Sequence, residues 1–303
     1  IPDDVVAMAR ASAEKDGRPG WKLTLQFPSY FPVMQYAEAR ERRARMYRAS
    51  ATRASEFGDA ALDNGPIIGK IPALRAQEAR MLGYGSFAEV SLEPKMADSP
   101  AQVIDFLRDF VRRAKPFAER DLAELRAFAH DELKLDALEA WDINYVSEKL
   151  REARYAFAEN EVKQYFVADK VLAGLFGVIH RLYGVDILPG DEPGWDPAVQ
   201  CFRIERDGEL VGQFFLDLYA RETKSGGAWM DSARSRYRTA AGVQTPVAYL
   251  VCNFLAPVGD RPATLSHDNI VTLFHECGHG LHHLLSRVDD LAVAGIHGVE
   301  WDA

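Results

Sequence analysis

The amino-acid sequence predicts a mainly α-helical protein with a small antiparallel β-sheet next to one histidine-rich helix. Before residue 185, hydrophobic residues recur mostly at helical spacing. From residue 185 onward, short alternating segments separated by Gly, Pro and Asp favour strands. The segment Ser266–Arg287 then returns to a helical pattern. We therefore expect a helical region, 1–184, and a second region, 185–303, that contains the sheet and the last helix.

The first region is expected to be helical except for one short strand. Trp21–Phe27 alternates like a strand and is closed by Pro28. Gly65–Gly69 should interrupt the helical pattern, and Pro116 should kink or restart the longest helix. The basic run from Arg40 to Arg53 contains Glu41 and follows Glu38, so we interpret it as a solvated helix face. The predicted helices are Pro2–Asp16, Phe31–Phe57, Ile71–Leu82, Ala101–Leu133, Trp141–Phe157 and Asn160–Tyr183.

Three strands are predicted in the second region. Val199–Glu205 and Glu209–Leu218 flank Asp207-Gly208, which is a hairpin turn signal. Thr245–Phe254 is the third strand and lies shortly before the last helix. An open edge on this strand could hold an extended peptide through main-chain hydrogen bonds. Alternatively, the strand only supports the helix, and the sequence favours neither interpretation.

The last helix separates an apolar face from a polar face on a helical wheel, and Ser266 is a suitable N-cap. The polar face carries histidines instead of the usual Lys and Glu. The apolar face contains Ile270, Leu273, Phe274, Cys277, Leu281, Leu284 and Leu285. The polar face contains Asp268, Thr272, His275, Glu276, His279, His282 and His283.

Within this helix, His275-Glu276-Cys277-Gly278-His279 forms the motif HExxH. Histidines at i and i+4 lie one turn apart on one face, where two imidazoles can bind one metal ion. Glu276 lies about 100° further round the helix, near the metal without being required as a ligand. This arrangement is typical of zinc hydrolases, in which the metal lowers the pKa of water and the carboxylate accepts its proton. We predict zinc ligands at His275 and His279 and a general base at Glu276.

The alternative interpretation of the same helix is an amphipathic helix with an unusually histidine-rich solvent face. His282 and His283 lie one turn further along, and we expect them to line or support the site instead of binding metal. Cys277 points to the apolar side, so we expect it in the core and not among the ligands.

The composition excludes several classes of function. The net charge of −9 over 303 residues provides no basic surplus for nucleic acid. No apolar run approaches the ~18 residues of a membrane span, so no membrane partner is expected. Three scattered cysteines form no disulfide framework and favour a reducing compartment.

Several longer segments resemble the thimet oligopeptidase family of zinc metallopeptidases. The similarity lies in PSYFPVMQYAEARERRARMYRASATRAS, WDINYVSEKLREARY, FFLDLYARETKSGGAWM, PVAYLVCNF and FHECGHGLHHLLS, and it extends over essentially the whole chain. The resemblance implies a zincin-like oligopeptidase fold with a deep channel. It also implies a cytoplasmic zinc endopeptidase that hydrolyses short peptides inside that channel. It also implies that His275 and His279 bind zinc and that Glu276 is the base.

The sequence departs from the family pattern in two ways. Cys277 stands where the family commonly has Phe, which should repack the core without removing activity. In the family the third zinc ligand is a Glu on a helix that follows a segment like Trp301-Asp302-Ala303, so it would fall just beyond Ala303. Glu300 has the most suitable spacing among the acids within the chain, but the resemblance places it in the connecting loop.

We therefore expect the front part of a catalytic region, inactive by itself and completed by the remainder of the same protein. Two other functions remain open. The chain could be a non-catalytic helical interaction protein with a remnant HExxH motif, or one half of a split peptidase that a second chain completes.

Overall fold

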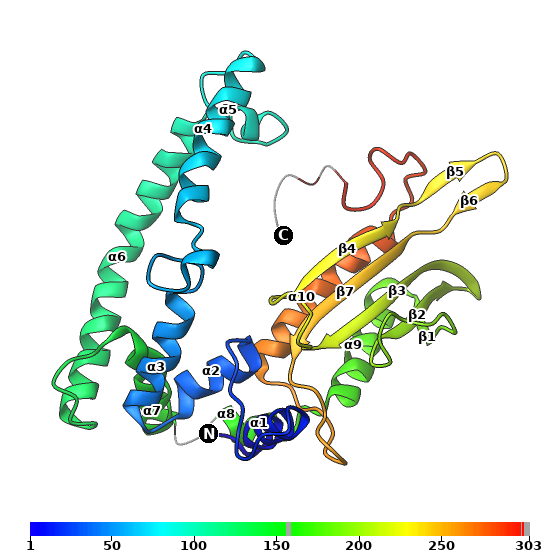
Figure 1. The fold of residues 1–303 in the computed structure, drawn as a ribbon. Coiled ribbons are helices and arrows are strands. Elements are labelled where there is room, and N and C mark those ends of the chain that lie inside the picture. Colours follow the sequence, from blue (N-terminus) through cyan, green and yellow to red (C-terminus); the bar gives the residue numbers. More distant parts are fainter. Residues whose placement is uncertain (156–158, 298, 300–303) are drawn as a thin grey trace. The chain divides into compact units, whose positions relative to one another are not determined.

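The computed structural model describes residues 1–155, 159–297 and 299, and these residues form two compact units (Figure 1). One unit contains Ile1–Pro32 together with 159–297. The other is the helical unit, 33–155. The division falls inside helix α2, Phe27–Tyr36, at Pro32.

The helical unit contains no strand among its described residues and is built mainly from two long helices. Its α-helices are α3 (Arg40–Ala51), α4 (Gly65–Met81), α5 (Phe87–Leu92), α6 (Pro100–Asp131) and α7 (Ile143–Tyr155). The predicted helix Phe31–Phe57 is in fact divided between α2 and α3. The predicted break at Gly65–Gly69 is wrong, because α4 begins there with Pro66 in its first turn, where a missing N–H costs little. The helix α6 runs through Pro116 without ending.

The expectation of a fully solvated basic face on α3 is wrong at Arg43, which is 1% exposed. Its Nη2 atom donates to Oδ1 of Asp142 over 2.7 Å, and Asp142 is itself fully buried. Arg40 donates to the same carboxylate through Nε and Nη2. Burial would raise the pKa of Asp142, but the hydrogen bonds from Arg40 and Arg43 outweigh it and lower this pKa. The run therefore contains a buried ion pair that joins α3 to the start of α7.

The other unit, which we call the sheet unit, contains a sheet, a two-stranded hairpin, four complete helices and the first part of α2. Its helices are α1 (Asp3–Lys15), α8 (Glu159–Lys163), α9 (Ala168–Tyr183) and α10 (His267–Leu284). The strands are β1 (Asp186–Pro189), β2 (Gln200–Arg206), β3 (Glu209–Tyr219), β4 (Trp229–Arg234), β5 (Tyr237–Thr239), β6 (Gly242–Gln244) and β7 (Val247–Phe254). The predicted strand Trp21–Phe27 is wrong, since 21–26 is irregular and Phe27 begins α2.

The main sheet has the order β1-β2-β3-β7-β4, while β5 and β6 pair separately. The prediction of an antiparallel sheet is wrong in one respect, because β3 and β7 pair in parallel. The chain leaves β3, forms β4 and the β5–β6 hairpin, and then returns between β3 and β4. A local turn signal specifies only strands that are adjacent in sequence, so it could not reveal this insertion.

The hairpin between β2 and β3 confirms the expected turn. Asp207 has φ +52° and Gly208 has φ +81°, as a type I′ turn requires. The antiparallel register continues from Arg206–Glu209 to Gln200–Leu216, with one irregularity near Ile204.

The core of this unit lies between one face of the sheet and the helices α9 and α10. Phe202, Phe214 and Leu250 are buried on that face. Phe176 of α9 packs edge-on against Phe202, with 5.1 Å between the ring centroids. A Cβ atom added at Gly280 of α10 would lie 2.9 Å from Cδ2 of Leu250, so the Leu250 side chain would have to shift. The missing side chain therefore lets α10 lie close to β7.

No helix in the described part of the chain is both long enough and apolar enough to cross a membrane.

Candidate metal centre

The helix α10 begins with a complete capping box. The Ser266 hydroxyl accepts from the backbone N–H of Asn269 (3.1 Å), and the Asn269 side chain accepts from the backbone N–H of Ser266 (3.2 Å). The predicted N-cap is therefore confirmed. It fixes the start of the helix two turns before the histidines.

His275 and His279 are brought together on the outer side of α10. Their Nε2 atoms lie 3.0 Å apart, and the two rings are nearly perpendicular, at 87°. Two imidazoles that bind one zinc ion at about 2.0–2.1 Å each, at the tetrahedral angle, bring their nitrogens to roughly 3.3 Å. The observed separation differs from that value by only a few tenths of an ångström, so this pair fits a shared metal ion.

The intervening residues differ in their environment. Glu276 is only 7% exposed, so its carboxylate lies on the buried flank of the histidine pair and not in open solvent. Cys277 lies in the core as predicted, and burial raises the pKa of its thiol to about 12. It therefore stays a neutral core side chain at physiological pH.

The helical wheel predicted the wrong exposure at two positions of α10. Phe274, assigned to the apolar face, is 39% exposed. His283, assigned to the polar face, has no exposed surface, and its Nε2 atom lies 2.8 Å from the carbonyl oxygen of Arg234. Because β4 covers α10 on that side, the buried arc of the helix is wider than the pattern of apolar residues indicates.

The third ligand cannot be assigned to a residue that the structure describes. Within 1–155, 159–297 and 299, no group of three His, Cys, Asp or Glu side chains could hold a metal ion. Glu300 lies outside the described residues, as do Trp301, Asp302 and Ala303.

The sheet edge nearest to the centre is formed by β4 and not by the strand predicted from sequence. The predicted strand Thr245–Phe254 is β7, which pairs on both sides, with β3 and with β4. Neither of its edges can therefore hold a peptide. The strand β4 is at the end of the sheet order and contacts α10.

Comparison of the whole chain with known proteins agrees with the family resemblance that the sequence motifs indicate. Residues 33–303 match the model of peptidase family M3. The chain belongs to this family. It is 47% identical to oligopeptidase A of Salmonella typhimurium and of Escherichia coli, over all of this chain. It is 42% identical to the organellar oligopeptidase A of Arabidopsis thaliana over 93% of this chain, and 32% identical to the dipeptidyl carboxypeptidase of S. typhimurium over 94%.

The M3 relatives are longer than this chain. The alignments cover 45% of the S. typhimurium oligopeptidase A, 36% of the Arabidopsis protein and 42% of the dipeptidyl carboxypeptidase. The chain therefore spans about half the length, or less, of the relatives that it matches.

A buried charge cluster in this M3 chain holds the loop that precedes β4. Asp217 is 1% exposed. It accepts two hydrogen bonds from Arg221, at 2.6 and 2.7 Å, and forms an ion pair with Lys224 at 2.8 Å. Burial lowers the pKa of Lys224, and the contact with Asp217 opposes that shift. Nothing in the hydrophobic pattern marked Asp217 as buried, since it lies in the predicted strand beside apolar residues.

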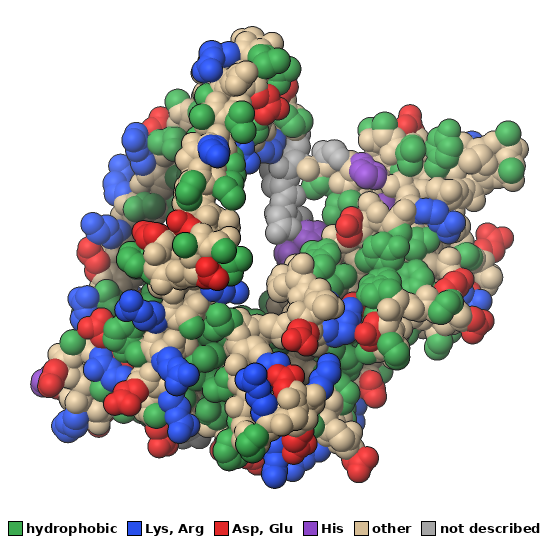
Figure 2. Space-filling view, viewed as in Figure 1, with side chains coloured by type: hydrophobic (Ala, Val, Ile, Leu, Met, Phe, Trp, Pro, Cys, Tyr) green, Lys and Arg blue, Asp and Glu red, His purple; other side chains and the backbone are tan. Residues whose placement is uncertain are grey.

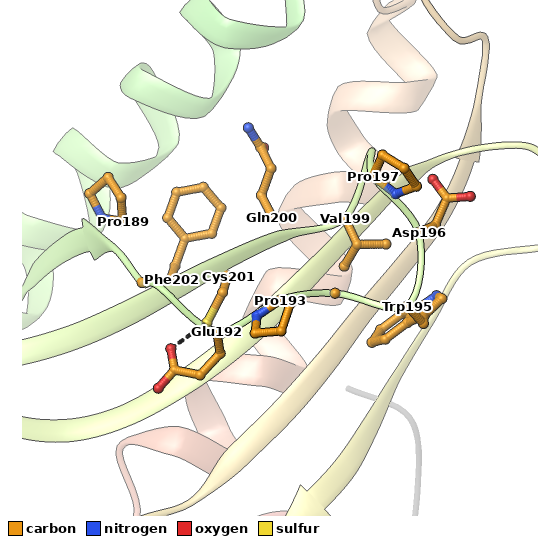
Figure 3. A pocket seen from close by; sticks show the side chains of 12 residues that line it. Pro189, Glu192, Pro193, Trp195, Asp196, Pro197, Val199, Gln200, Cys201 and Phe202 are labelled. Atoms are coloured by element: carbon orange, nitrogen blue, oxygen red, sulfur yellow. Dashed lines mark hydrogen bonds between the residues drawn. The ribbon is translucent and has the colours of Figure 1, made fainter.

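Two further pockets in the sheet unit are lined by residues that the structure describes. The first, of about 580 Å³, is formed by the loop after β1 and by the start of β2 (Figure 3). Two carboxylates line it, and one of them, Glu192, accepts from Gln213 (2.9 Å) and from the Cys201 thiol (3.4 Å). Burial and Glu192 raise the pKa of Cys201 to about 11, so this thiol is not a ready nucleophile. The second pocket, of about 600 Å³, flanks α10 beside Gly278 and His282.

The structure thus unites His275 with His279, places Glu276 in the same turn, and leaves His282 exposed. Sequence reasoning did not identify β4. The only signal for β4 is the Gly226-Gly227 break before Trp229, and the strand itself is too short for a clear alternation.

Proposed function

We propose that this chain is part of a zinc metallo-endopeptidase that hydrolyses short peptides. The observation that carries the proposal is the convergence of the His275 and His279 Nε2 atoms, 3.0 Å apart, beside the buried Glu276. The M3 relatives named oligopeptidase support this proposal. In this proposal the chain is an incomplete catalytic fragment that is inactive by itself.

In the proposed site, His275 and His279 hold zinc, and a Glu beyond Ala303 is the third ligand. The bound metal supplies a Lewis acid that polarises the scissile carbonyl and acidifies water. Glu276 accepts a proton from the attacking water and delivers it to the leaving amine.

The open edge of β4 is the proposed holder of the substrate backbone. A peptide in extended conformation would pair with it through main-chain hydrogen bonds, which require no particular side-chain sequence. We further propose that 1–184 forms channel walls and that 185–303 forms the front of the catalytic region. A cytoplasmic location agrees with the three cysteines, which are all free.

Replacement of Glu276 tests the proposal in the complete protein that contains this chain. Glu276→Gln preserves the size of the side chain and removes the base. We expect stoichiometric zinc to be retained, whereas hydrolysis of a flexible fluorogenic peptide should fall by about 10²–10⁴-fold. The measurements are metal content by mass spectrometry and steady-state turnover.

The matched control is Glu209→Gln, the same change at an exposed position of the β2–β3 hairpin. It should leave both zinc content and turnover unchanged. A Glu276→Gln protein that retains more than half of the parent rate would exclude the assigned base. If the parent protein binds no zinc and cleaves no peptide, the result would favour the alternative that the chain is a non-catalytic interaction protein with a remnant HExxH motif.

A further inference from the structure

His283 connects the HExxH helix to the edge strand. The residue lies one turn beyond His279 on α10 and is fully buried. Its Nε2 atom is 2.8 Å from the carbonyl oxygen of Arg234, the last residue of β4. A carbonyl oxygen can only accept, so Nε2 is the protonated nitrogen and donates this hydrogen bond.

The ring of His283 is tightly surrounded by Gly295 and His297. The Nδ1 atom is buried and has no hydrogen-bond partner among the described residues. A Cβ atom at Gly295 would lie 2.4 Å from Nδ1, so this approach requires glycine. His297 lies nearby, with 6.3 Å between the ring centroids, and its Nε2 atom is 2.8 Å from the Ser235 hydroxyl, directly after β4. The ring of His283 is therefore enclosed, and its one hydrogen bond has a fixed direction.

This end of β4 is where the sheet itself constrains the strand least. The pairing of β4 with β7 is regular from Trp229 to Ser232 and becomes irregular between Ser232 and Arg234. A bulge of this kind leaves a residue without a ladder partner and lets the strand bend. Arg234 resumes the pairing, opposite Val247, and the hydrogen bond from His283 reaches its carbonyl oxygen, so the helix adds a second constraint directly after the irregularity.

The opposite end of β4 is held by a different side chain. Asn253 of β7 donates through Nδ2 to the carbonyl oxygens of Ser225 (2.8 Å) and Gly227 (2.7 Å), just before the strand begins. The edge strand is thus held at its start from the sheet and at its end from the metal-binding helix. Only the second of these contacts relates the strand directly to His275 and His279.

We propose that His283 is a positioning residue that sets the distance between the edge strand β4 and the histidine pair on α10. The proposal rests on the proposed function, in which a peptide lies along β4 and is cleaved beside His275 and His279. Because His283 and His279 are one turn apart on the same rigid helix, the contact with Arg234 also sets the distance from β4 to the histidine pair. Without this contact, the peptide and the histidine pair would be aligned less accurately, and displacements of about 1 Å can cost about 100-fold in rate.

The test compares two amides that imitate different nitrogens of the imidazole. His283→Gln places its amide N–H near the position of Nε2 and can still donate to Arg234. His283→Asn is one methylene shorter and cannot reach that oxygen. Hydrogen–deuterium exchange of 229–234, in the zinc-loaded complete protein, should be about tenfold faster in the Asn variant than in the parent. The Gln variant should remain within about threefold of the parent, and β2 and β3 should be unchanged in both.

The functional measurement separates positioning from general loss of structure. Zinc content should be equal in all variants, while kcat/KM for a flexible peptide should fall at least about tenfold in His283→Asn and recover in His283→Gln. His180→Asn, at an exposed histidine of α9, is the matched control and should behave like the parent.

Two outcomes would overturn the proposal. One is unchanged exchange of β4 in His283→Asn. The other is faster exchange of β4 without a decrease in kcat/KM, which would leave His283 a purely structural role. If the parent protein shows no zinc-dependent peptidase activity, the proposed function fails, and the exchange measurement still decides whether His283 holds β4.

Discussion

At the scale of single residues, the candidate site depends on how a few side chains are enclosed. His275 is exposed and His279 half-buried, while Glu276 and His283 in the same helix are buried. This gradient arises because β4 and the segment after α10 cover one flank of the helix. The HExxH motif therefore has a solvent-facing pair of imidazoles beside a carboxylate that is largely removed from water.

Gly295 provides a test at this scale. Gly295→Ala adds a Cβ atom 2.4 Å from Nδ1 of His283 and does so at φ +68°, a conformation that L-residues adopt only with strain. We expect the free energy of unfolding to fall by about 1–3 kcal/mol, measured by denaturant titration.

The matched control is the same substitution at Gly174, in the helix α9. An added Cβ atom would meet nothing there within 4 Å, and the position is helical and exposed. Gly174→Ala should raise stability by about 0.5–1 kcal/mol, since alanine is the better helix former. Equal effects at the two glycines would contradict the close contact between Gly295 and His283.

At the scale of secondary-structure elements, buried polar contacts join segments that the hydrophobic pattern does not connect. In the helical unit, Arg43 and Asp142 link α3 to the start of α7, and Arg43 also lies over the ring of Tyr145, 4.1 Å from its centroid. In the sheet unit, Asp217, Arg221 and Lys224 hold the loop before β4. Each cluster balances a buried carboxylate with two cations.

Asp142 makes the stability of the helical unit depend on pH. Its folded-state pKa is lowered, so its contribution is fully present above the unfolded value of about 3.9 and is lost as pH falls through the folded pKa. The thermal midpoint of the parent should therefore decrease as pH is lowered from about 5 to below 4.

Asp142→Asn removes this titration and leaves Arg43 buried without its charge partner. At pH 7 we expect a loss of about 3–5 kcal/mol in the free energy of unfolding. The variant should also show a shallower decrease in stability than the parent at acidic pH. Parallel pH profiles for the two proteins would show that Asp142 does not contribute as described.

At the scale of the whole molecule, the helical unit exposes many large apolar side chains. Figure 2 shows hydrophobic side chains at its surface between the charged ones. On α6, Phe106 is 69% exposed and Phe110 is 62% exposed, and on α4 Leu74 is 64% exposed. Apolar surface of this extent marks places where a protein contacts something else. In the proposed function, these helices belong to the channel walls, and part of their apolar surface contacts the remainder of the complete protein.

The size of the substrate tests the proposed channel. A folded domain cannot enter a narrow channel without the cost of its unfolding free energy, so the complete protein should cleave flexible peptides of roughly 6–20 residues and leave folded proteins intact. One cleavable sequence should be presented free in solution and then within a stably folded domain. Cleavage of both at the same rate would favour an open groove over a channel.

Most of what the sequence predicted correctly is local. The N-cap at Ser266, the turn at Asp207-Gly208 and the burial of Cys277 each depend on residues within a few positions of one another. The convergence of His275 and His279 is also local, because four residues make about one helical turn. The mainly helical class and the family followed from patterns that extend along the whole chain.

Tertiary structure alone decided how distant segments meet. The parallel pairing of β3 with β7, the position of β4 at the edge, and the burial of Arg43 and His283 all depend on residues far apart in the sequence. A helical wheel shows which side of α10 is apolar, but it cannot show that a strand ending at Arg234 covers its polar flank. The reason is physical: periodicity reports the preference of a segment for a buried face, whereas the partner on that face is selected by packing over the whole fold.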